Sequence, residues 1–191
     1  MTGRTHDLAA FTALTYLVAT QPLQEITLST AMVAFGANML GGLAPDIDQS
    51  TASFWGKIRG GNIISKLISP LLGGHRFISH SILGIFLFGF ILQILLDAAS
   101  SVLLVNMDIV WWAFMIGFVS HLLMDTFTRE GVPWFFPIPI RFGIPPLRFL
   151  RIKTGGKIEK YFIFPGLVFI NFYLIYLNYQ KFLDFFKQYL R

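Results

Sequence analysis

The sequence predicts an all-α membrane protein: a polytopic bundle of four core helices, with a fifth apolar segment that spans or re-enters the bilayer. Hydrophobic residues make up 54% of the 191 positions and charged residues only 13%, whereas about a quarter of a soluble domain is charged. The mean hydropathy is +0.63. The apolar residues also fall into runs near the length of about 20 residues that a spanning helix needs. We therefore expect one membrane-embedded domain over residues 1–191.

Five apolar segments follow one another along the chain. Their approximate bounds are 7–20, 27–43, 79–96, 109–125 and 161–179. The first is short for a full span. The second is rich in Gly and Ala, which let membrane helices approach closely. The fifth has aromatic residues at both ends, as segments at membrane interfaces do, and it is interrupted by Pro165-Gly166.

The basic residues lie in the long connections, and this predicts the topology. Arg4 and the connections after the second and fourth segments hold twelve of the fifteen Lys and Arg residues, while the short connections at 21–26 and 97–108 hold none. The positive-inside rule places the N-terminus and both long connections in the cytoplasm. The three remaining basic residues lie in the C-terminal tail. They would fall outside if the fifth segment spans, so that segment is either re-entrant or an exception to the rule.

The connection at 126–160 is expected to lie in the membrane interface. It carries seven basic residues, and its stretch 133–139 combines prolines with aromatic residues. Prolines lack an amide donor and fix the backbone, so this stretch cannot be a regular helix. We therefore divide the domain into a metal-site core at about 1–140, a basic interfacial loop at 126–160 and a C-terminal apolar segment at 161–180.

Polar residues gather at those ends of the apolar segments that an up-and-down bundle brings to one face, here the cytoplasmic face. The residues are His6 before the first segment, Asp46 and Asp48 after the second, His75 and His80 before the third, and His121 and Asp125 at the end of the fourth. His121 and Asp125 are four residues apart, so they share one face of a helix. Polar groups at the end of a membrane helix are costly unless they have partners or a function.

These residue types point to a divalent metal. The chain has no cysteine, so a metal site must use His and carboxylate ligands, which suit Zn²⁺ first and Mn²⁺ or Fe²⁺ as alternatives. Seven candidates exceed the needs of one tetrahedral ion. We expect one or two ions, with some residues orienting the ligands. Asp48, His75 and Arg76 are expected to act in catalysis, with Arg76 binding a phosphoryl oxygen.

Each of these residues also has a structural explanation when it is taken alone. A single His or Asp at a helix end is usually a cap or a solvated residue. The stretch Pro45-Asp46-Ile47-Asp48 has the composition of a turn. Arg76 can be a charge that sets the topology. The convergence of all four histidines on one face favours the metal site over these explanations.

Four motifs within about the first 140 residues carry a family resemblance. They are Thr5-His6, Gly42-Leu-Ala-Pro-Asp-Ile-Asp48, His75-Arg-Phe-Ile-Ser-His-Ser81, and Ser120 to Asp125 followed by Thr128, Gly131 and Pro133 to Pro137. Together they resemble the YdjM family, described as inner-membrane-associated, metal-dependent hydrolases and linked by name to LexA binding. The order of the motifs is also similar to that of zinc-dependent phospholipase C, an all-helical enzyme with a zinc cluster.

The similarity to phospholipase C implies a set of metal ligands. They are His6, Asp46, His80 or His75, His121 and Asp125. Phospholipase C has further His and Glu ligands downstream, whereas this chain has no histidine after His121. The resemblance therefore implies a site of one or two ions rather than three.

These observations lead to a functional hypothesis with two alternatives. The first is a metal-dependent hydrolase of the inner membrane whose site faces the cytoplasm and whose substrate is a phosphoester, such as a phospholipid or a lipid-linked phosphate. The second is a non-enzymatic scaffold that recruits a cytoplasmic protein through the basic loop. The third, a metal transporter, is weaker, because the third and fourth segments offer little polar lining beyond Gln93. A nucleic-acid partner is not expected, because the sequence has no Lys- and Arg-rich run with interleaved aromatic residues.

Overall fold

The computed structural model shows an all-helical protein, as the sequence predicts. It describes residues 1–21, 26–49, 55, 61, 63, 65–66, 77–138 and 140–189. The α-helices are α1 (Gly3–Thr20), α2 (Leu28–Leu43), α5 (Ile82–Ala99), α6 (Met107–Thr126), α7 (Phe164–Leu177) and α8 (Tyr179–Lys187). Within these ranges there is no β-strand, only two isolated bridges in the loop after α6.

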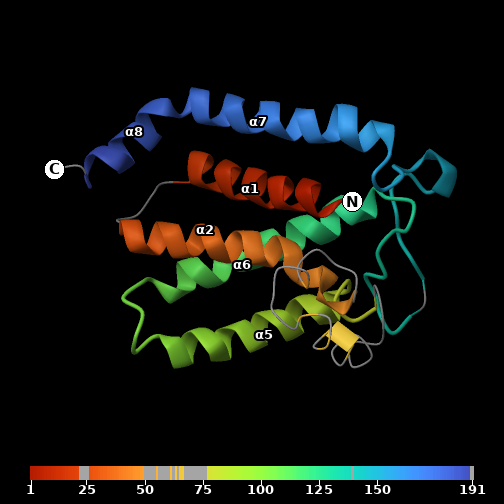
Figure 1. Cartoon of the computed structure of the whole chain (residues 1–191), viewed down its shortest axis with the longest axis horizontal. Coiled ribbons are helices and arrows are strands. Elements are labelled where there is room, and N and C mark those ends of the chain that lie inside the picture. The colour runs from red at the N-terminus through yellow and green to blue at the C-terminus, as the bar shows by residue number, and fades with distance from the viewer. Residues whose placement is uncertain are drawn as a thin grey trace.

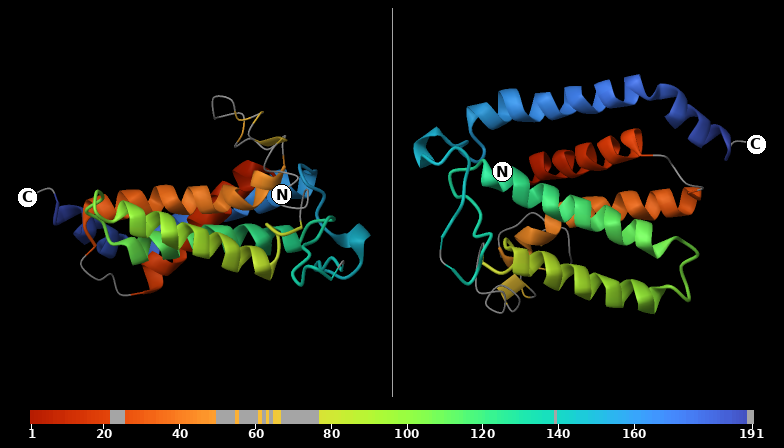
Figure 2. Two further views of the ribbon diagram at one scale, coloured as in Figure 1. Left: turned by 90° about the horizontal axis from the view of Figure 1, so that it is seen from below. Right: turned by 180° about the vertical axis from the view of Figure 1, so that it is seen from behind.

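Four helical stretches are long and apolar enough to cross a membrane. They are Leu28–Asp48, Ile82–Ala99, Met107–Thr126 and Glu159–Leu177. Helix α6 is the centre of the bundle and packs against α1, α2 and α5. In Figure 1, α7, α1, α2 and α5 follow one another down the picture while α6 passes behind α1 and α2; the reverse view in Figure 2 shows α6 in front. The C-terminal end of α6 meets the start of α1 through Asp125 and His6, and the end of α2 through His121 and Gly42.

Helix α1 is not one of the four candidate spans, and its position explains why it need not be strongly apolar. It packs against α6 and α2 on one side and α7 on the other. Figure 1 shows it between α7 and α2 over its whole length. A helix enclosed by protein has little surface in contact with lipid, so polar residues such as Thr5, Thr12 and Thr15 can face neighbouring helices.

Small residues set the close approach of α2 and α6. A Cβ atom on Gly41 would lie 2.0 Å from the carbonyl oxygen of Phe114, and one on Gly117 would lie 2.2 Å from that of Asn38. Only glycine fits at either position. Asn38 Nδ2 donates to the Ala113 carbonyl at 2.9 Å and joins the two helices at the same level. The Gly-rich composition of the second segment is therefore used for helix packing.

The fifth apolar segment is continuous, contrary to the predicted interruption at Pro165-Gly166. A π-helical turn, η3 (Glu159–Ile163), leads directly into α7. Pro165 lies at the first positions of α7, directly after the π-helical turn, so the change of helix type falls where proline cannot donate a backbone hydrogen bond. The whole stretch Glu159–Leu177 is long enough to cross a bilayer.

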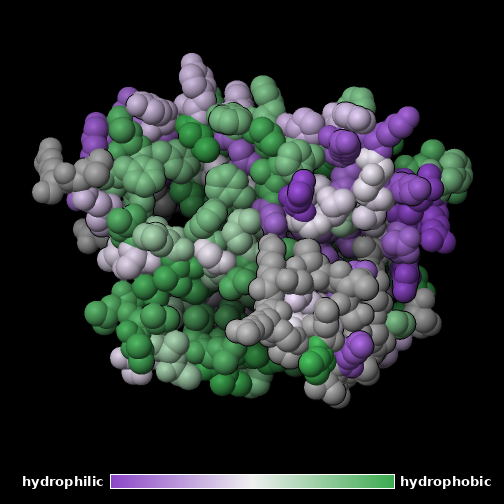
Figure 3. Space-filling view, viewed as in Figure 1, coloured by the Kyte–Doolittle hydropathy of each residue, from purple (hydrophilic) through white to green (hydrophobic). Residues whose placement is uncertain are grey.

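The loop after α6 lies over the end of the bundle where α1 begins. Val132 is fully buried and packs with Phe118 and Leu122 of α6, and this anchors the loop. Several apolar side chains of the loop remain exposed, including Phe135, Ile144, Leu147 and Phe149. In Figure 3, hydrophobic residues gather over α2 and α5, and hydrophilic residues gather at the end that carries the N-terminus and this loop. The expected interfacial position of the loop stays a prediction.

Candidate metal centre

The fold brings the predicted polar residues together at one end of the bundle. His6 lies in the first turns of α1, and Asp46 and Asp48 lie in the 3₁₀-helix η1 (Ala44–Asp48) that follows α2. His80 precedes α5, where Ser81 caps the helix by accepting from the Gly84 N–H at 3.1 Å. His121 and Asp125 lie in the last turns of α6. His75 and Arg76 lie outside the described residues.

Among the described residues, six predicted side chains meet, and five of them form two groups with metal-ligand spacing. One group is His6, His121 and Asp125; the other is Asp46, His80 and His121. In each group the candidate ligand atoms lie within 4.8 Å of one another. All five side chains except Asp46 are fully buried, and Asp46 is 20% exposed. Among these five side chains, Asp46 is therefore the one that solvent or a ligand can reach.

The separations within the cluster fit a shared cation better than direct hydrogen bonds. Asp46 Oδ1 lies 3.7 Å from His80 Nε2 and 3.6 Å from His121 Nε2. Direct N–H···O hydrogen bonds span about 2.7–3.2 Å. Ligand atoms bound tetrahedrally at about 2.0–2.1 Å from zinc lie about 3.3 Å apart. A small contraction around an ion would bring these atoms to bonding distance.

His121 has the orientation of a metal ligand. Its Nδ1 lies 2.7 Å from the carbonyl oxygen of Gly42. A carbonyl can only accept, so Nδ1 carries the proton and the neutral ring has its lone pair on Nε2. Nε2 is buried and has no hydrogen-bond partner in the described part of the chain. A backbone carbonyl that orients a ligand imidazole in this way is a regular feature of metal sites.

Asp48 lies behind His80 rather than in either group of ligand atoms. The Ser79 hydroxyl donates to Asp48 Oδ2 and lies 2.9 Å from His80 Nδ1. Since the single Ser79 proton goes to the carboxylate, the hydroxyl accepts from His80 Nδ1–H. His80 Nε2 then carries the lone pair and faces Asp46. Asp48 and Ser79 therefore orient His80, and the catalytic role expected for Asp48 stays a prediction.

Asp125 connects the two groups. Its Oδ1 lies 3.2 Å from His6 Nε2, while its Oδ2 lies 3.9 Å from both His80 Nε2 and His121 Nε2. Two carboxylate oxygens that face different imidazoles are the arrangement of a bridging ligand. His121 appears in both groups, but Nε2 can bind only one ion. The geometry thus accommodates one ion, or two ions with Asp125 between them.

The amino group of Met1 reaches the same atoms. It lies 2.9 Å from His6 Nε2 and donates to Asp125 Oδ1. Met1 is buried, and its ammonium group places a positive charge where His6 and Asp125 would hold a metal ion. Burial lowers the pKa of His6, whose helix is not one of the candidate spans. The neutral form of the ring, which can bind a metal, is therefore favoured.

Sequence reasoning missed Glu159, which fixes the start of α1. The carboxylate is 2% exposed and accepts four hydrogen bonds: from Thr2 N–H at 2.7 Å, Thr2 Oγ1 at 2.8 Å, Thr5 Oγ1 at 2.6 Å and Gly155 N–H at 2.7 Å. Thr2 and Thr5 flank the turn that leads to His6. Glu159 ends the basic loop, far from the histidines in sequence, so only the tertiary fold reveals its role.

Comparisons with known proteins give a family and one curated relative. The family model described as YdjM inner membrane protein matches residues 1–182. A protein of Bacillus subtilis (strain 168), named Uncharacterized protein YvsG, is 32% identical over 180 residues, which are 93% of this chain and 96% of the relative. No solved structure matches.

Proposed function

Because the chain belongs to the YdjM family of inner membrane proteins, we propose that it is a membrane-embedded, metal-dependent hydrolase that cleaves a phosphoester at the cytoplasmic membrane surface. Zn²⁺ is the preferred ion for the His and Asp donors, with Mn²⁺ or Fe²⁺ as alternatives. The substrate is a phospholipid or a lipid-linked phosphate, because the cluster opens at the end of the bundle where apolar helices meet a basic loop.

The observation that carries this proposal is the buried His121 ring with its Nδ1–H on the Gly42 carbonyl. Burying an imidazole among carboxylates at the end of an apolar helix is costly. The donor set of three imidazoles and two carboxylates is one that divalent transition metals bind strongly. Hydrogen bonds could account for His6 and Asp125, which lie 3.2 Å apart, but His80 and His121 lie 3.6–3.9 Å from the carboxylates of Asp46 and Asp125, too far for such bonds.

The chain's own residues divide the work of the proposed reaction. His6, His121 and Asp125 would hold an ion in the buried part of the cluster. Asp46 and His80 would complete the site on the side where Asp46 is exposed. A bound divalent ion supplies a water of lowered pKa and neutralises charge on the phosphoryl oxygens. Asp46 is the partly exposed member, so it lies nearest to an incoming substrate. Asp48 and Ser79 keep His80 in one tautomer and one orientation.

The distribution of charge supports a cytoplasmic site. Arg4 and the loop between α6 and η3 lie at the same end of the bundle as the histidines. At the opposite end, Lys181 donates to the carbonyls of Val18 at 2.6 Å and Ala19 at 3.1 Å. This lysine caps α1, so it contributes less to the topological charge balance than its position in the sequence suggests.

The alternative is a scaffold that recruits a cytoplasmic protein through the loop. The exposed apolar and basic side chains between Arg129 and Lys160 favour it. The scaffold would bind its partner without a metal, whereas the hydrolase would not act without one.

The test is a hydrolysis screen on protein purified in detergent with a C-terminal tag, since Met1 is buried. Metal-stripped and Zn²⁺- or Mn²⁺-reloaded samples are assayed on phosphodiesters, phosphomonoesters and phospholipids. Activity should require metal, and Asp46→Asn should lower it at least about 100-fold, the upper range for losing a group that merely supports a ligand. Asp108→Asn, at the other end of α6, is the control. Metal-independent turnover, or full activity in Asp46→Asn, would refute the proposal.

A further inference from the structure

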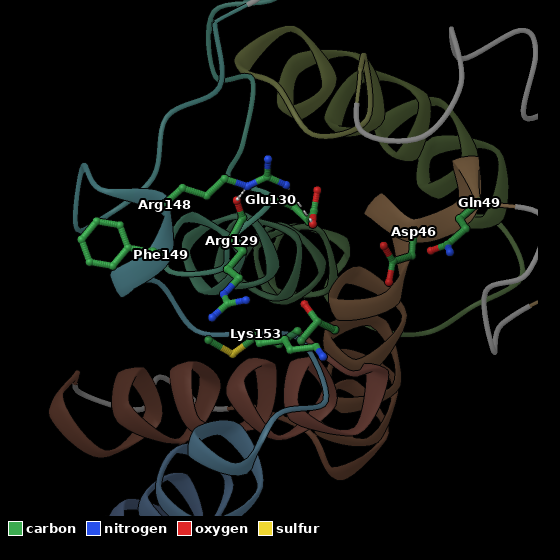
Figure 4. Close-up of a pocket in the computed structure, with 9 residues that line it drawn as sticks. Asp46, Gln49, Arg129, Glu130, Arg148, Phe149 and Lys153 are labelled. Carbon is green, nitrogen blue, oxygen red and sulfur yellow. Dashed lines mark hydrogen bonds and ion pairs between the residues drawn. The ribbon is translucent and has the colours of Figure 1, made fainter.

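A pocket of about 780 Å³ opens over the histidine cluster. Its lining includes Met1, Asp46 and Gln49 on one side and Arg129, Arg148 and Lys153 on the other. In Figure 4, the Asp46 carboxylate extends from η1 toward the middle of the pocket, and the side chains of Arg129 and Lys153 enter it from the loop. The pocket thus joins the one partly exposed member of the cluster to a basic wall.

The backbone of the loop places Arg129 beside Lys153. Thr128 and Ile152 form a parallel bridge, and the Arg129 N–H donates to the Ile152 carbonyl at 3.0 Å. The two basic residues each follow a bridged residue, so they are neighbours although they are 24 positions apart. Arg148 Nε donates to the Arg129 carbonyl at 3.1 Å and holds this part of the loop in place.

The side chains of Arg129 and Lys153 are not paired with a carboxylate in the described part of the protein. Neither side chain makes a hydrogen bond or an ion pair with another described residue. Glu130, the acidic residue beside them, is engaged by Arg148 at 3.6 Å and Arg141 at 3.9 Å. The pocket therefore presents two positively charged side chains that form no ion pair with a described residue. A phosphate monoester carries a charge of about −1.5 to −2 at neutral pH, which matches them better than a carboxylate does.

Apolar side chains adjoin one edge of the pocket, at Phe149. Phe149 belongs to the lining and is 71% exposed, and its neighbours Leu147 and Leu150 are each 55% exposed. Exposed aromatic and aliphatic side chains next to basic ones are typical of segments that lie at the membrane surface. A ligand held here would have an anionic group at the deep end and apolar chains at the rim.

We propose that this pocket is the substrate subsite for the phosphate group of a lipid phosphate monoester, bound by Arg129 and Lys153. Arg129 offers its planar donors to two phosphoryl oxygens, and Lys153 adds a point charge. Arg148 positions Arg129 and neutralises Glu130. The inference rests on the proposed hydrolase in one respect: the subsite delivers the phosphate to the metal cluster beside Asp46.

The test measures binding rather than turnover. Detergent-solubilised protein is titrated with short-chain phosphatidic acid, with the matching uncharged diacylglycerol, and with glycerol phosphate as the head group without chains. Wild-type protein should bind phosphatidic acid more tightly than either control ligand. Arg129→Gln and Lys153→Gln should each weaken that binding about tenfold, as expected for one charge-assisted hydrogen bond. Lys157→Gln, an exposed loop residue outside the pocket lining, should leave it unchanged.

Two measurements separate this inference from the proposed function. Metal content should be equal in wild type, Arg129→Gln and Lys153→Gln, because neither residue belongs to the two groups of candidate ligands. If metal is absent but the two variants still lose affinity for phosphatidic acid, the subsite stands and the hydrolase fails. If the variants bind phosphatidic acid as wild type does, the subsite is refuted whatever the metal content. Equal affinity for glycerol phosphate and phosphatidic acid would refute the lipid assignment.

Discussion

Each end of α1 is held by a charged side chain from the C-terminal part of the chain, but only the N-terminal end carries a candidate site. At the N-terminal end the carboxylate of Glu159 binds the donors of Thr2 and Thr5, and at the C-terminal end the Lys181 ammonium binds the carbonyls of Val18 and Ala19. Both charges oppose the helix dipole, so both stabilise α1. Glu159 and Lys181 both come from the C-terminal part of the chain, which fastens α1 into the bundle.

The difference lies in what remains after these contacts are made. At the Lys181 end, the ammonium group donates to the backbone carbonyls of Val18, Ala19 and Gln21, so its charge serves to hold the helix end. At the Glu159 end, His6, His121 and Asp125 face one another in the interior. His6 lies 3.2 Å from Asp125, but His121 lies 3.9 Å from it, too far for a direct hydrogen bond. In a bundle of apolar helices, buried polar side chains that do not serve to hold the helices in place indicate a function.

Removing the bridging carboxylate should have the largest effect. Asp125→Ala deletes the carboxylate that lies between the two groups and leaves the Met1 ammonium group buried without its partner. We expect metal affinity to fall by more than about 100-fold, and the free energy of unfolding to fall by about 3 kcal/mol. Elemental analysis and thermal unfolding in detergent measure the two effects. Asp97→Ala at the opposite end of the bundle, where the carboxylate accepts an exposed hydrogen bond from Gln93, should change neither.

The close contact of α2 and α6 should be the next most sensitive feature. Gly41→Ala puts a methyl group where the Phe114 carbonyl lies, so the helices must separate. We expect a loss of about 3 kcal/mol in the free energy of unfolding and weaker metal binding, because the Gly42 carbonyl moves away from His121. Gly36→Ala, in the same helix, meets nothing within 4 Å and should be neutral or stabilising by up to about 1 kcal/mol. Equal behaviour of the two variants would contradict the packing account.

Glu159 and Lys181, which hold the two ends of α1, give a matched pair of variants with smaller effects on stability. Glu159→Gln and Lys181→Met each remove a charge that accepts or donates several hydrogen bonds, so each should cost about 1–3 kcal/mol of stability. Only Glu159→Gln should lower metal affinity, by about 10-fold, because it loosens the turn that carries His6. Thermal unfolding and zinc titration separate these outcomes. A metal loss of the same size in Lys181→Met would mean that metal binding reports only general stability.

Much of the fold is predictable from the sequence because apolar runs of bilayer length dominate it. The alternation of helix direction then places His6, His80 and His121 at one end without any tertiary information. The fifth segment was predicted wrongly at Pro165, because a proline at the start of a helix was taken as a break within it. The preceding π-helical turn begins at Glu159, whose contacts with Thr2 and Thr5 join residues that are far apart in the sequence and were not predicted.

The parts of the site that depend on tertiary contacts were not predictable. Arg129 and Lys153 are neighbours because Thr128 and Ile152 form a bridge. The sequence around these two residues does not predict that pairing. The role of Asp48 as a partner of Ser79 and His80, rather than a member of the ligand groups, depends on the rotation of the η1 turn. The residue types predicted which side chains could bind a metal. They did not predict which side chains orient the ligand histidines through hydrogen bonds.

The central claim, that the buried cluster binds a metal ion, is tested most directly by His121→Asn. The Asn amide nitrogen replaces Nδ1 and can still donate to the Gly42 carbonyl, while the Nε2 lone pair is removed. Metal content and thermal unfolding are measured on the same metal-loaded and metal-stripped samples. Wild-type protein should hold one or two ions per chain. His121→Asn should lose them, yet in the metal-stripped state unfold within about 1 kcal/mol of stripped wild type. A wild type without stoichiometric metal, or a variant that keeps it, would contradict the account.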